Sequence, residues 1–243
     1  MKEENEETSK EIDTHQKNWD EVYAKQNMTL WEPQQSIVQF TARFVKKRIG
    51  YDKYEVKRNA NKILDLGCGN GGAVHFFAKQ GFEAHGIDIS KAAIFVAEDY
   101  LKKESLTAKF EICSCDNLPF ENNTFDVITC FGVLDHVDMN LAIGTIKEVK
   151  RTLTNGGLFF ITLCSTRATP FGRGEKTERH TYVLEEGHEK GEIQHYFDLE
   201  EIRELLDGFK IIDLRHSTEE AYGQNNEPLG KSARWFVTAE ATE

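Results

Sequence analysis

Hydrophobic positions follow two alternating spacings over most of the chain. Beyond Lys62, short apolar runs of strand length alternate with longer segments in which apolar residues recur at helical spacing. The runs cover residues 63–66, 84–89, 109–113, 125–131 and 157–163, and the helical segments cover residues 72–79, 91–103 and 141–153. Strands separated by helices of this length pair in parallel through right-handed crossovers. The pattern therefore predicts an α/β, doubly wound sheet with helices on both faces.

Three further segments complete the chain. Residues 1–14 have few apolar side chains, which predicts a disordered acidic tail before a single domain at residues 15–243. Residues 15–50 show helical spacing with a break at Trp31 and Pro33, and predict two cap helices. Residues 164–197 are rich in Gly, Glu and His and predict a lid or binding insertion. A helix at 198–206 and strands at 209–214 and 233–239 follow.

Charge and composition exclude several classes of protein. The net charge of −11 repels phosphate backbones, so nucleic acid is not expected as a partner. The basic residues between Lys46 and Lys62 are interpreted as a solvated helix face and linker. No apolar run approaches the roughly 20 residues that cross a bilayer, and no secretory signal is evident. We therefore expect a cytoplasmic protein without a membrane partner.

Cysteine and histidine spacing argues against a metal or disulfide framework. The five cysteines are odd in number and form no CxxC pair. His180, His188 and His195 lie 8 and 7 residues apart, which matches no compact ligand pattern. Neither a metal nor a disulfide is expected.

The strongest chemical signal is a glycine loop between a strand and a helix. Residues 63–72 read Ile-Leu-Asp-Leu-Gly-Cys-Gly-Asn-Gly-Gly. Glycines allow a ligand to approach the backbone, and the helix start offers free N–H groups. Asp88 ends the next strand about 20 residues after Gly67, where an acid can accept hydrogen bonds from ribose hydroxyls. These features suit a nicotinamide dinucleotide and S-adenosylmethionine (SAM) equally well.

The segments that follow resemble the class I SAM-dependent methyltransferase family over about residues 63–163. DLGCGNG at 65–71 resembles its first motif, CDNLPF at 115–120 its acidic loop, and residues 125–137 its fourth motif. LTNGGL at 153–158 resembles the family's turn before the fifth strand, with Asn155 in place of the usual proline. The resemblance implies a Rossmann-like, seven-stranded, mostly parallel sheet whose last strand is antiparallel. The N-terminal helices and the insertion would cap this sheet.

The resemblance also implies a donor site for SAM. Asp65 would hold the amino group of its methionine part, and Asp116 the amino group of adenine, with Asn117 supporting the ring. Nicotinamide fingerprints rarely carry an acid at the position of Asp65. The donor-binding residues implied are Trp31, Asp65, Gly67, Cys68, Gly69, Asn70, Gly71, Asp88, Ile89, Asp116, Asn117 and Cys130.

The acceptor side is less defined by the sequence. His136 lies just beyond the fourth strand and is a candidate catalytic base, with packing or a backbone contact as the alternative. The substrate candidates are Tyr23, His136, His195 and Tyr196. The predicted function is transfer of a methyl group from SAM to a small molecule by in-line displacement. A tRNA-base methyltransferase, a non-catalytic SAM-binding protein and a nicotinamide dehydrogenase are the alternatives. The acceptor and the oligomeric state stay open.

Overall fold

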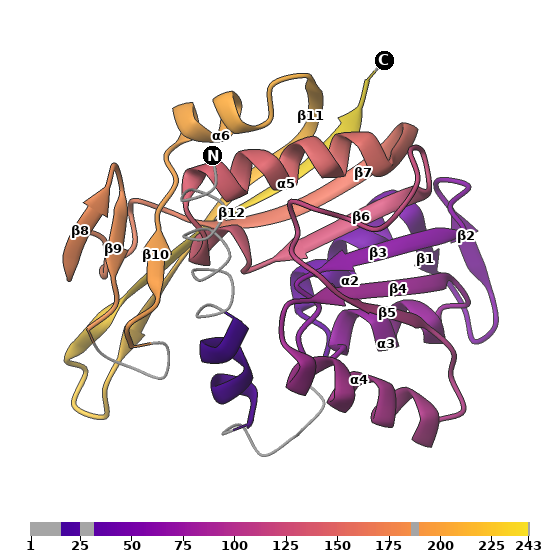
Figure 1. The fold of residues 1–243 in the computed structure, drawn as a ribbon, viewed down its shortest axis with the longest axis horizontal. Coiled ribbons are helices and arrows are strands. Elements are labelled where there is room, and N and C mark those ends of the chain that lie inside the picture. The colour runs from indigo at the N-terminus through magenta and orange to yellow at the C-terminus, as the bar shows by residue number, and fades with distance from the viewer. Residues whose placement is uncertain (1–15, 25–31, 186–189, 243) are drawn as a thin grey trace, which may run out of the picture.

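A seven-stranded sheet forms the centre of the computed structural model, which describes residues 16–24, 32–185 and 190–242 (Figure 1). The strand order is β11-β12-β7-β6-β3-β4-β5. The strands are β3 (Lys62–Leu66), β4 (Glu83–Asp88), β5 (Lys109–Ile112), β6 (Phe125–Phe131), β7 (Leu153–Cys164), β11 (Phe209–Tyr222) and β12 (Pro228–Ala241). Strands β3 to β7 pair in parallel, whereas β12 is antiparallel to both β7 and β11. The predicted fold, with an inserted antiparallel last strand, is confirmed.

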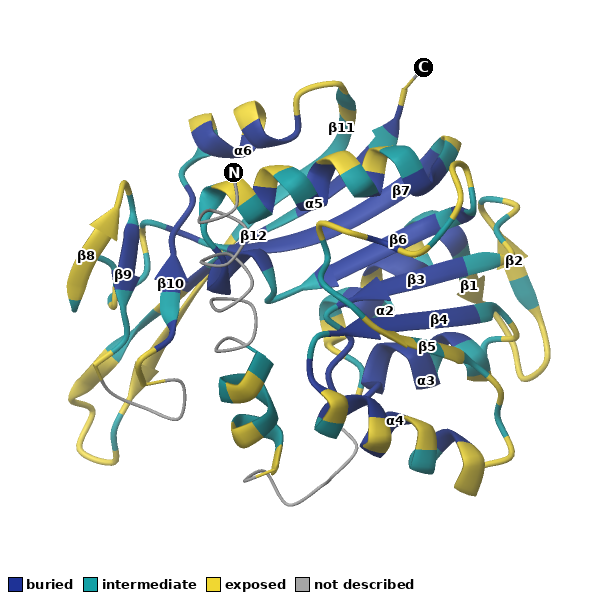
Figure 2. Ribbon diagram, in the orientation of Figure 1, coloured by how far each residue is buried: buried dark blue, intermediate teal, exposed yellow. Residues whose placement is uncertain are grey.

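Helices cover both faces of the sheet, and each face has its own hydrophobic cluster. One cluster joins α5 (Met139–Thr152) and α6 (Leu199–Leu205) to the sheet, and the other joins α2 (Gln35–Phe40), α3 (Gly72–Lys79) and α4 (Lys91–Lys103). Successive strand residues point to opposite faces. Ile63 therefore packs in the second cluster, and Leu64 packs in the first. Figure 2 shows the central strands buried between these layers.

Only the first N-terminal helix, residues 16–24, lies at the carboxyl edge of the sheet, beside α4 and the insertion (Figure 1). The second, α2, covers a face of the sheet instead, because Phe40 is fully buried and its ring stacks on Phe160 at a centroid distance of 4.7 Å. A π-helical turn, Thr41–Val45, then leads into a hairpin of β1 (Lys46–Arg48) and β2 (Tyr54–Val56).

The interpretation of the basic stretch as a helix face is therefore wrong. Lys46 begins a strand, its ammonium donates to the carbonyl of Gln80 at 2.7 Å, and it lies over the Tyr54 ring. These contacts give the basic side chain partners that a solvated helix face would not provide.

The insertion is not an open loop. It contains a three-stranded antiparallel sheet of β8 (Glu175–Glu178), β9 (Thr181–Val183) and β10 (Ile193–His195). Strands of three or four residues are too short to show a hydrophobic period, which is why the sequence pattern misses them. In the described part of the chain, no helix is both long and apolar enough to span a membrane.

Candidate active site

Parallel pairing brings the predicted donor residues together at the carboxyl edge of the sheet. Asp65 in β3 pairs with Gly86 of β4 on one side and with Thr129 of β6 on the other. The glycine loop leaves the end of β3, and Asp88 ends β4 directly beside it. The crevice outside the carboxyl ends of parallel strands is where open α/β sheets bind ligands.

The conformation of the glycine loop explains why it needs glycine. Gly67, Gly69 and Gly71 have φ angles of 63°, 52° and 87°, in the left-handed region that residues other than glycine rarely adopt. The Gly69 N–H donates to Oδ2 of Asp88 at 2.8 Å, and the Ser90 N–H donates to Oδ1 at 2.9 Å. Asp88 therefore fixes both the loop and the turn into α4.

Asp65 is a buried acid in an electronegative setting. The hydroxyl of Thr129 donates to Oδ1 of Asp65 at 2.5 Å. Burial raises the pKa of Asp65 to about 7; the Thr129 hydrogen bond opposes this shift, and the charge of Asp88 adds to it. None of these influences comes from a cation. A ligand group with a positive charge would favour ionised Asp65, whereas an anionic pyrophosphate would be repelled there.

Three cysteines surround the two acids. Burial, followed by the nearby charge of Asp88, raises the pKa of the Cys68 and Cys115 thiols. Burial also raises the pKa of Cys130, the next-to-last residue of β6, and its role in donor binding stays a prediction. A raised thiol pKa suppresses the reactive thiolate, so these residues act as small apolar groups here.

The predicted adenine segment follows β5. Asp116 and Asn117 are exposed, and the Ser114 hydroxyl donates to Oδ1 of Asp116 at 2.5 Å. The Asn117 N–H donates to the carbonyl of Ser114 at 3.2 Å, which closes a turn. This turn presents both polar side chains to solvent beyond the end of β5.

The helix of residues 16–24 lies against the donor edge. Asp20 accepts hydrogen bonds from the Ser90 hydroxyl at 2.6 Å and from the Ala92 N–H at 3.1 Å, so it caps the start of α4. The Tyr23 hydroxyl lies 2.7 Å from the position that a Cβ on Gly69 would occupy. Tyr23 thus covers the glycine loop, as expected of a cap residue. Trp31, the other aromatic residue predicted for this cap, lies outside the described residues.

His136 lies in a short helical turn, Leu134–His136, after β6. Its Nδ1 is 3.2 Å from the carbonyl oxygen of Ile193, and its ring makes an edge contact with Trp19 at a centroid distance of 5.4 Å. A carbonyl can only accept a hydrogen bond, so Nδ1 carries the hydrogen. In the neutral tautomer that donates from Nδ1, the lone pair is on Nε2, which is the form that a general base requires.

Comparison with known proteins identifies the family of the chain. The family model described as a methyltransferase domain matches residues 57–207, which include the glycine loop, Asp88, Asp116 and His136. The chain belongs to the methyltransferase domain family. The nicotinamide alternative is thereby removed, in agreement with the buried acid before the loop.

Relatives of this methyltransferase-family chain have several functions. A ubiquinone biosynthesis O-methyltransferase of Coxiella burnetii is 30% identical over 117 residues, which cover 48% of this chain and 49% of the relative. The chain thus spans about half the length of the curated relatives it matches. A SAM-dependent methyltransferase of Methanosarcina mazei has a TM-score of 0.63 and 24% identity, covering 76% of this chain and 94% of its own.

A third relative was solved with a product of SAM. Phosphoethanolamine N-methyltransferase 2 of Haemonchus contortus, in complex with S-adenosylhomocysteine, has a TM-score of 0.58 and 19% identity, covering 86% of this chain and 53% of its own. Likenesses at this level show that the methyltransferase-family chain shares the Rossmann-like methyltransferase fold.

Two predicted substrate residues of this methyltransferase-family chain have packing contacts in the insertion. His195 is buried, with Nδ1 2.7 Å from the Thr181 hydroxyl and its ring 4.3 Å from that of Phe197. The Tyr196 ring contacts those of Phe171 and Tyr182, and burial raises its pKa to about 12. These contacts stabilise the insertion, and a substrate role for either residue stays a prediction.

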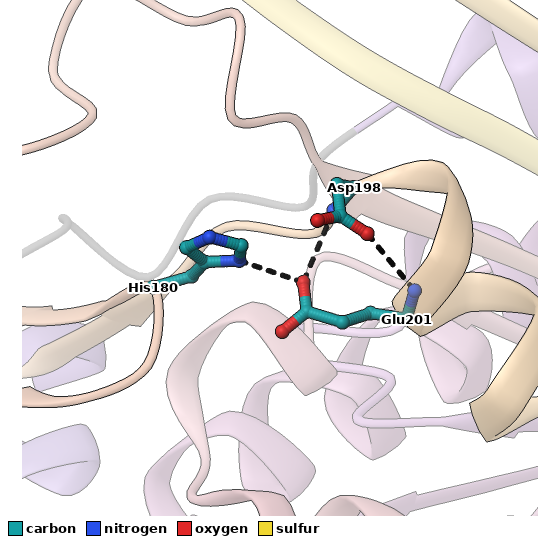
Figure 3. A group of neighbouring side chains, drawn as sticks. All are labelled: His180, Asp198 and Glu201. Atoms are coloured by element: carbon teal, nitrogen blue, oxygen red, sulfur yellow. Dashed lines mark hydrogen bonds and ion pairs between the residues drawn. The ribbon is translucent and has the colours of Figure 1, made fainter.

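His180, Asp198 and Glu201 form a cluster whose ligand atoms lie within 4.8 Å of one another (Figure 3). Its contacts are those of a helix cap. Asp198 and Glu201 form the capping box of α6, and Nδ1 of His180 lies 2.8 Å from Oε2 of Glu201. Arg179 also pairs with both acids, at 3.4 and 3.6 Å. Because the helix cap and the Arg179 guanidinium provide partners for these side chains, we assign no metal to the cluster.

Sequence reasoning missed the groups that hold the His136 turn. Asp135 is fully buried, accepts from the Cys164 N–H at 2.6 Å and pairs with Arg234 at 2.7 Å. Arg234 lies 99 residues away in β12. No local motif links the two positions. Asp20 was missed for the same reason, since its partner Ser90 is 70 residues away.

Proposed function

We propose that this chain transfers a methyl group from SAM to a small-molecule acceptor. The observation that carries the proposal is Asp65, a buried carboxyl beside a second acid, Asp88, at the start of the glycine loop. Burial is the main cause of its raised pKa of about 7, and the charge of Asp88 adds to it, so a ligand cation would favour the ionised carboxylate. SAM carries an ammonium and a sulfonium, whereas a dinucleotide would bring phosphate to this loop.

The donor residues then take distinct roles. Asp65 pairs with the ammonium of the methionine part, and Asp116 accepts from the adenine amino group. Asp88 accepts from the ribose hydroxyls. Its two oxygens already accept from Gly69 and Ser90, but a carboxylate offers about four lone-pair sites, so it can keep both bonds. Gly67, Cys68, Asn70, Gly71, Ile89, Asn117 and Cys130 complete the wall.

For methyl transfer, the main task of the protein is to position the acceptor relative to SAM. Bound SAM supplies a methyl group activated by the sulfonium charge, and the electron pair of the broken bond returns to sulfur. The chain must hold the acceptor nucleophile in line with that bond and exclude water. Tyr23 and Trp19 cover the site from the N-terminal helix. Nε2 of His136 can take a proton from an acceptor that is protonated at neutral pH, such as an alcohol or amine.

A small molecule is favoured over RNA as the acceptor. The Coxiella relative is named for ubiquinone biosynthesis, and the Haemonchus protein was solved with phosphomonomethylethanolamine. The net charge of −11 opposes binding to a phosphate backbone. These relatives methylate oxygen in one case and nitrogen in the other, so we do not assign the acceptor atom.

Calorimetric titration tests the donor assignment. The protein should bind S-adenosylhomocysteine and not NAD, and Asp65→Asn should weaken binding because it removes the charge but keeps the shape. A panel of phenols, amines and phosphorylated amines with SAM should then release S-adenosylhomocysteine for one class. Absence of binding to SAM and its product would refute the proposal. Binding without turnover on any acceptor would favour the non-catalytic alternative.

A further inference from the structure

One face of α5 carries three residues that all contact the segment after β5. Gly144, Glu148 and Arg151 are spaced at i, i+4 and i+7, which places them on the same side of the helix. The segment that they contact, residues 116–122, begins with Asp116 and ends shortly before β6. We call these three residues the α5 clamp.

Glu148 and Arg151 bind the backbone of this segment from both sides. Oε2 of Glu148 accepts from the Leu118 N–H at 2.8 Å, and Nη2 of Arg151 donates to the Leu118 carbonyl at 3.0 Å. Nη1 of Arg151 donates to the Phe120 carbonyl at 2.6 Å and to Oδ1 of Asn122 at 3.1 Å. In each of these bonds one partner, the Glu148 carboxylate or the Arg151 guanidinium, is charged, and charge-assisted hydrogen bonds are the stronger kind.

The clamp is itself preorganised. Nε and Nη2 of Arg151 donate to the two oxygens of Glu148 at 2.7 and 2.6 Å, which is the bidentate geometry that fixes a guanidinium plane. This hydrogen bonding holds the pKa of Glu148 below its usual value, so the pair stays charged near neutral pH. The Leu118 side chain is buried in the core cluster beneath. The segment is therefore tied to α5 and to the core at one residue.

Gly144 sets the distance between α5 and the first residue of the segment. A Cβ at this position would lie 2.9 Å from the Cβ of Asp116, closer than real Cβ contacts allow. Because Gly144 has a hydrogen in place of a side chain, Asp116 can approach the helix, two residues before the anchored Leu118. Glycine inside a helix is otherwise unfavourable relative to alanine. The close approach gives a physical reason for it here.

We infer that the α5 clamp is a positioning device that sets the selectivity of the site for the donor's adenine ring. The inference rests on the proposed function, since Asp116 and Asn117 meet adenine only if SAM is the donor. Both side chains are exposed, with the Ser114 contact at Asp116, so the backbone that the clamp holds determines where they point.

Gly144→Ala is the sharpest test, because alanine favours the helix and removes no hydrogen bond. We expect the Kd for S-adenosylhomocysteine to rise about tenfold, since a displaced contact residue costs affinity steeply. The preference over the deaminated analogue S-inosylhomocysteine should fall by a similar factor. A change in base preference is a result that a purely structural role would not produce.

Two substitutions of Arg151 and one control variant complete the test. Arg151→Gln should also lower affinity and base preference, and Arg151→Lys should restore part of both, because it keeps the charge beside Glu148 but not the fork. Lys147→Ala, on the exposed side of α5, should match the wild type. Circular dichroism should show folded protein throughout. If Gly144→Ala and Arg151→Gln keep wild-type affinity and base preference, the inference is wrong. A wild type that binds neither nucleoside would instead overturn the proposed function.

Discussion

Replacing Thr129 with valine removes one hydroxyl and preserves the branched shape, so its main effect is loss of the hydrogen bond to Asp65, since the other acceptor, the Leu64 carbonyl, is 3.5 Å away. That bond, 2.5 Å long, stabilises the ionised carboxylate. A hydrogen bond to a charged group contributes about 1.5–3 kcal/mol, and one pKa unit corresponds to about 1.4 kcal/mol. We therefore expect the pKa of Asp65 to rise by about one to two units above its value of about 7.

The sign of the effect on binding follows from the role of Asp65. Only the ionised carboxylate attracts the donor's ammonium, so affinity should increase as pH rises through the pKa of Asp65. At about pH 7 half of the wild-type carboxyl groups are ionised, against about a tenth or fewer in Thr129→Val. The Kd for S-adenosylhomocysteine should then be at least about fivefold higher in the variant at about pH 7, and the two proteins should converge as pH increases.

Calorimetric titration between about pH 6 and pH 8.5 gives the Kd at each pH, and the midpoint of its decrease with rising pH measures this pKa shift. Thr238→Val is the matched control, because Thr238 is buried in β12 and its hydroxyl has no hydrogen-bond partner in the described part of the chain. It should leave the midpoint unchanged. Identical midpoints for Thr129→Val and the wild type would show that Asp65 does not govern donor affinity.

Three further substitutions address other contacts. Asp88→Ala should weaken donor binding by about 1.5–3 kcal/mol, measured by titration, and unchanged affinity would remove it from the ribose role. Arg234→Ala leaves the buried Asp135 without its cation and should lower the free energy of unfolding in urea by about 3–5 kcal/mol, with partial recovery on adding Asp135→Asn. Asp20→Ala should speed hydrogen exchange in residues 16–24 and lower turnover, and unaltered exchange would rule out the α4 contact as its anchor.

The glycine loop and the position of Asp88 were predictable because their signals are local in sequence. The positive φ angles at Gly67, Gly69 and Gly71 favour glycine at these positions. Asp88 is the last residue of a strand whose apolar run is visible in the sequence. The spacing of the glycines, and of Asp88 after them, is visible in the sequence. The fold was predictable for the same reason, since alternating strands and helices leave few topologies.

Contacts between remote segments left no such signal. Asp135 pairs with Arg234 across 99 residues, and Asp20 reaches Ser90 across 70. His195 and Tyr196 show the opposite difficulty. Their residue types suit a pocket, but their observed neighbours are side chains of the insertion and of the segment that leads to α6, which no spacing rule could show.

The helix of residues 16–24 connects the two halves of the site. Asp20 accepts from the hydroxyl of Ser90, and the backbone N–H of Ser90 donates to Asp88. The helix is therefore linked through Ser90 to the residue proposed to hold the ribose. On its other side, Asn18 donates to Glu192 of the insertion at 2.7 Å, and Trp19 contacts His136. A segment held by a few polar contacts opens at a low free-energy cost. Because the same contacts place Trp19 beside His136, we expect closure over the donor and completion of the acceptor side to occur together. Release of the product should then require the Asp20 contact to break.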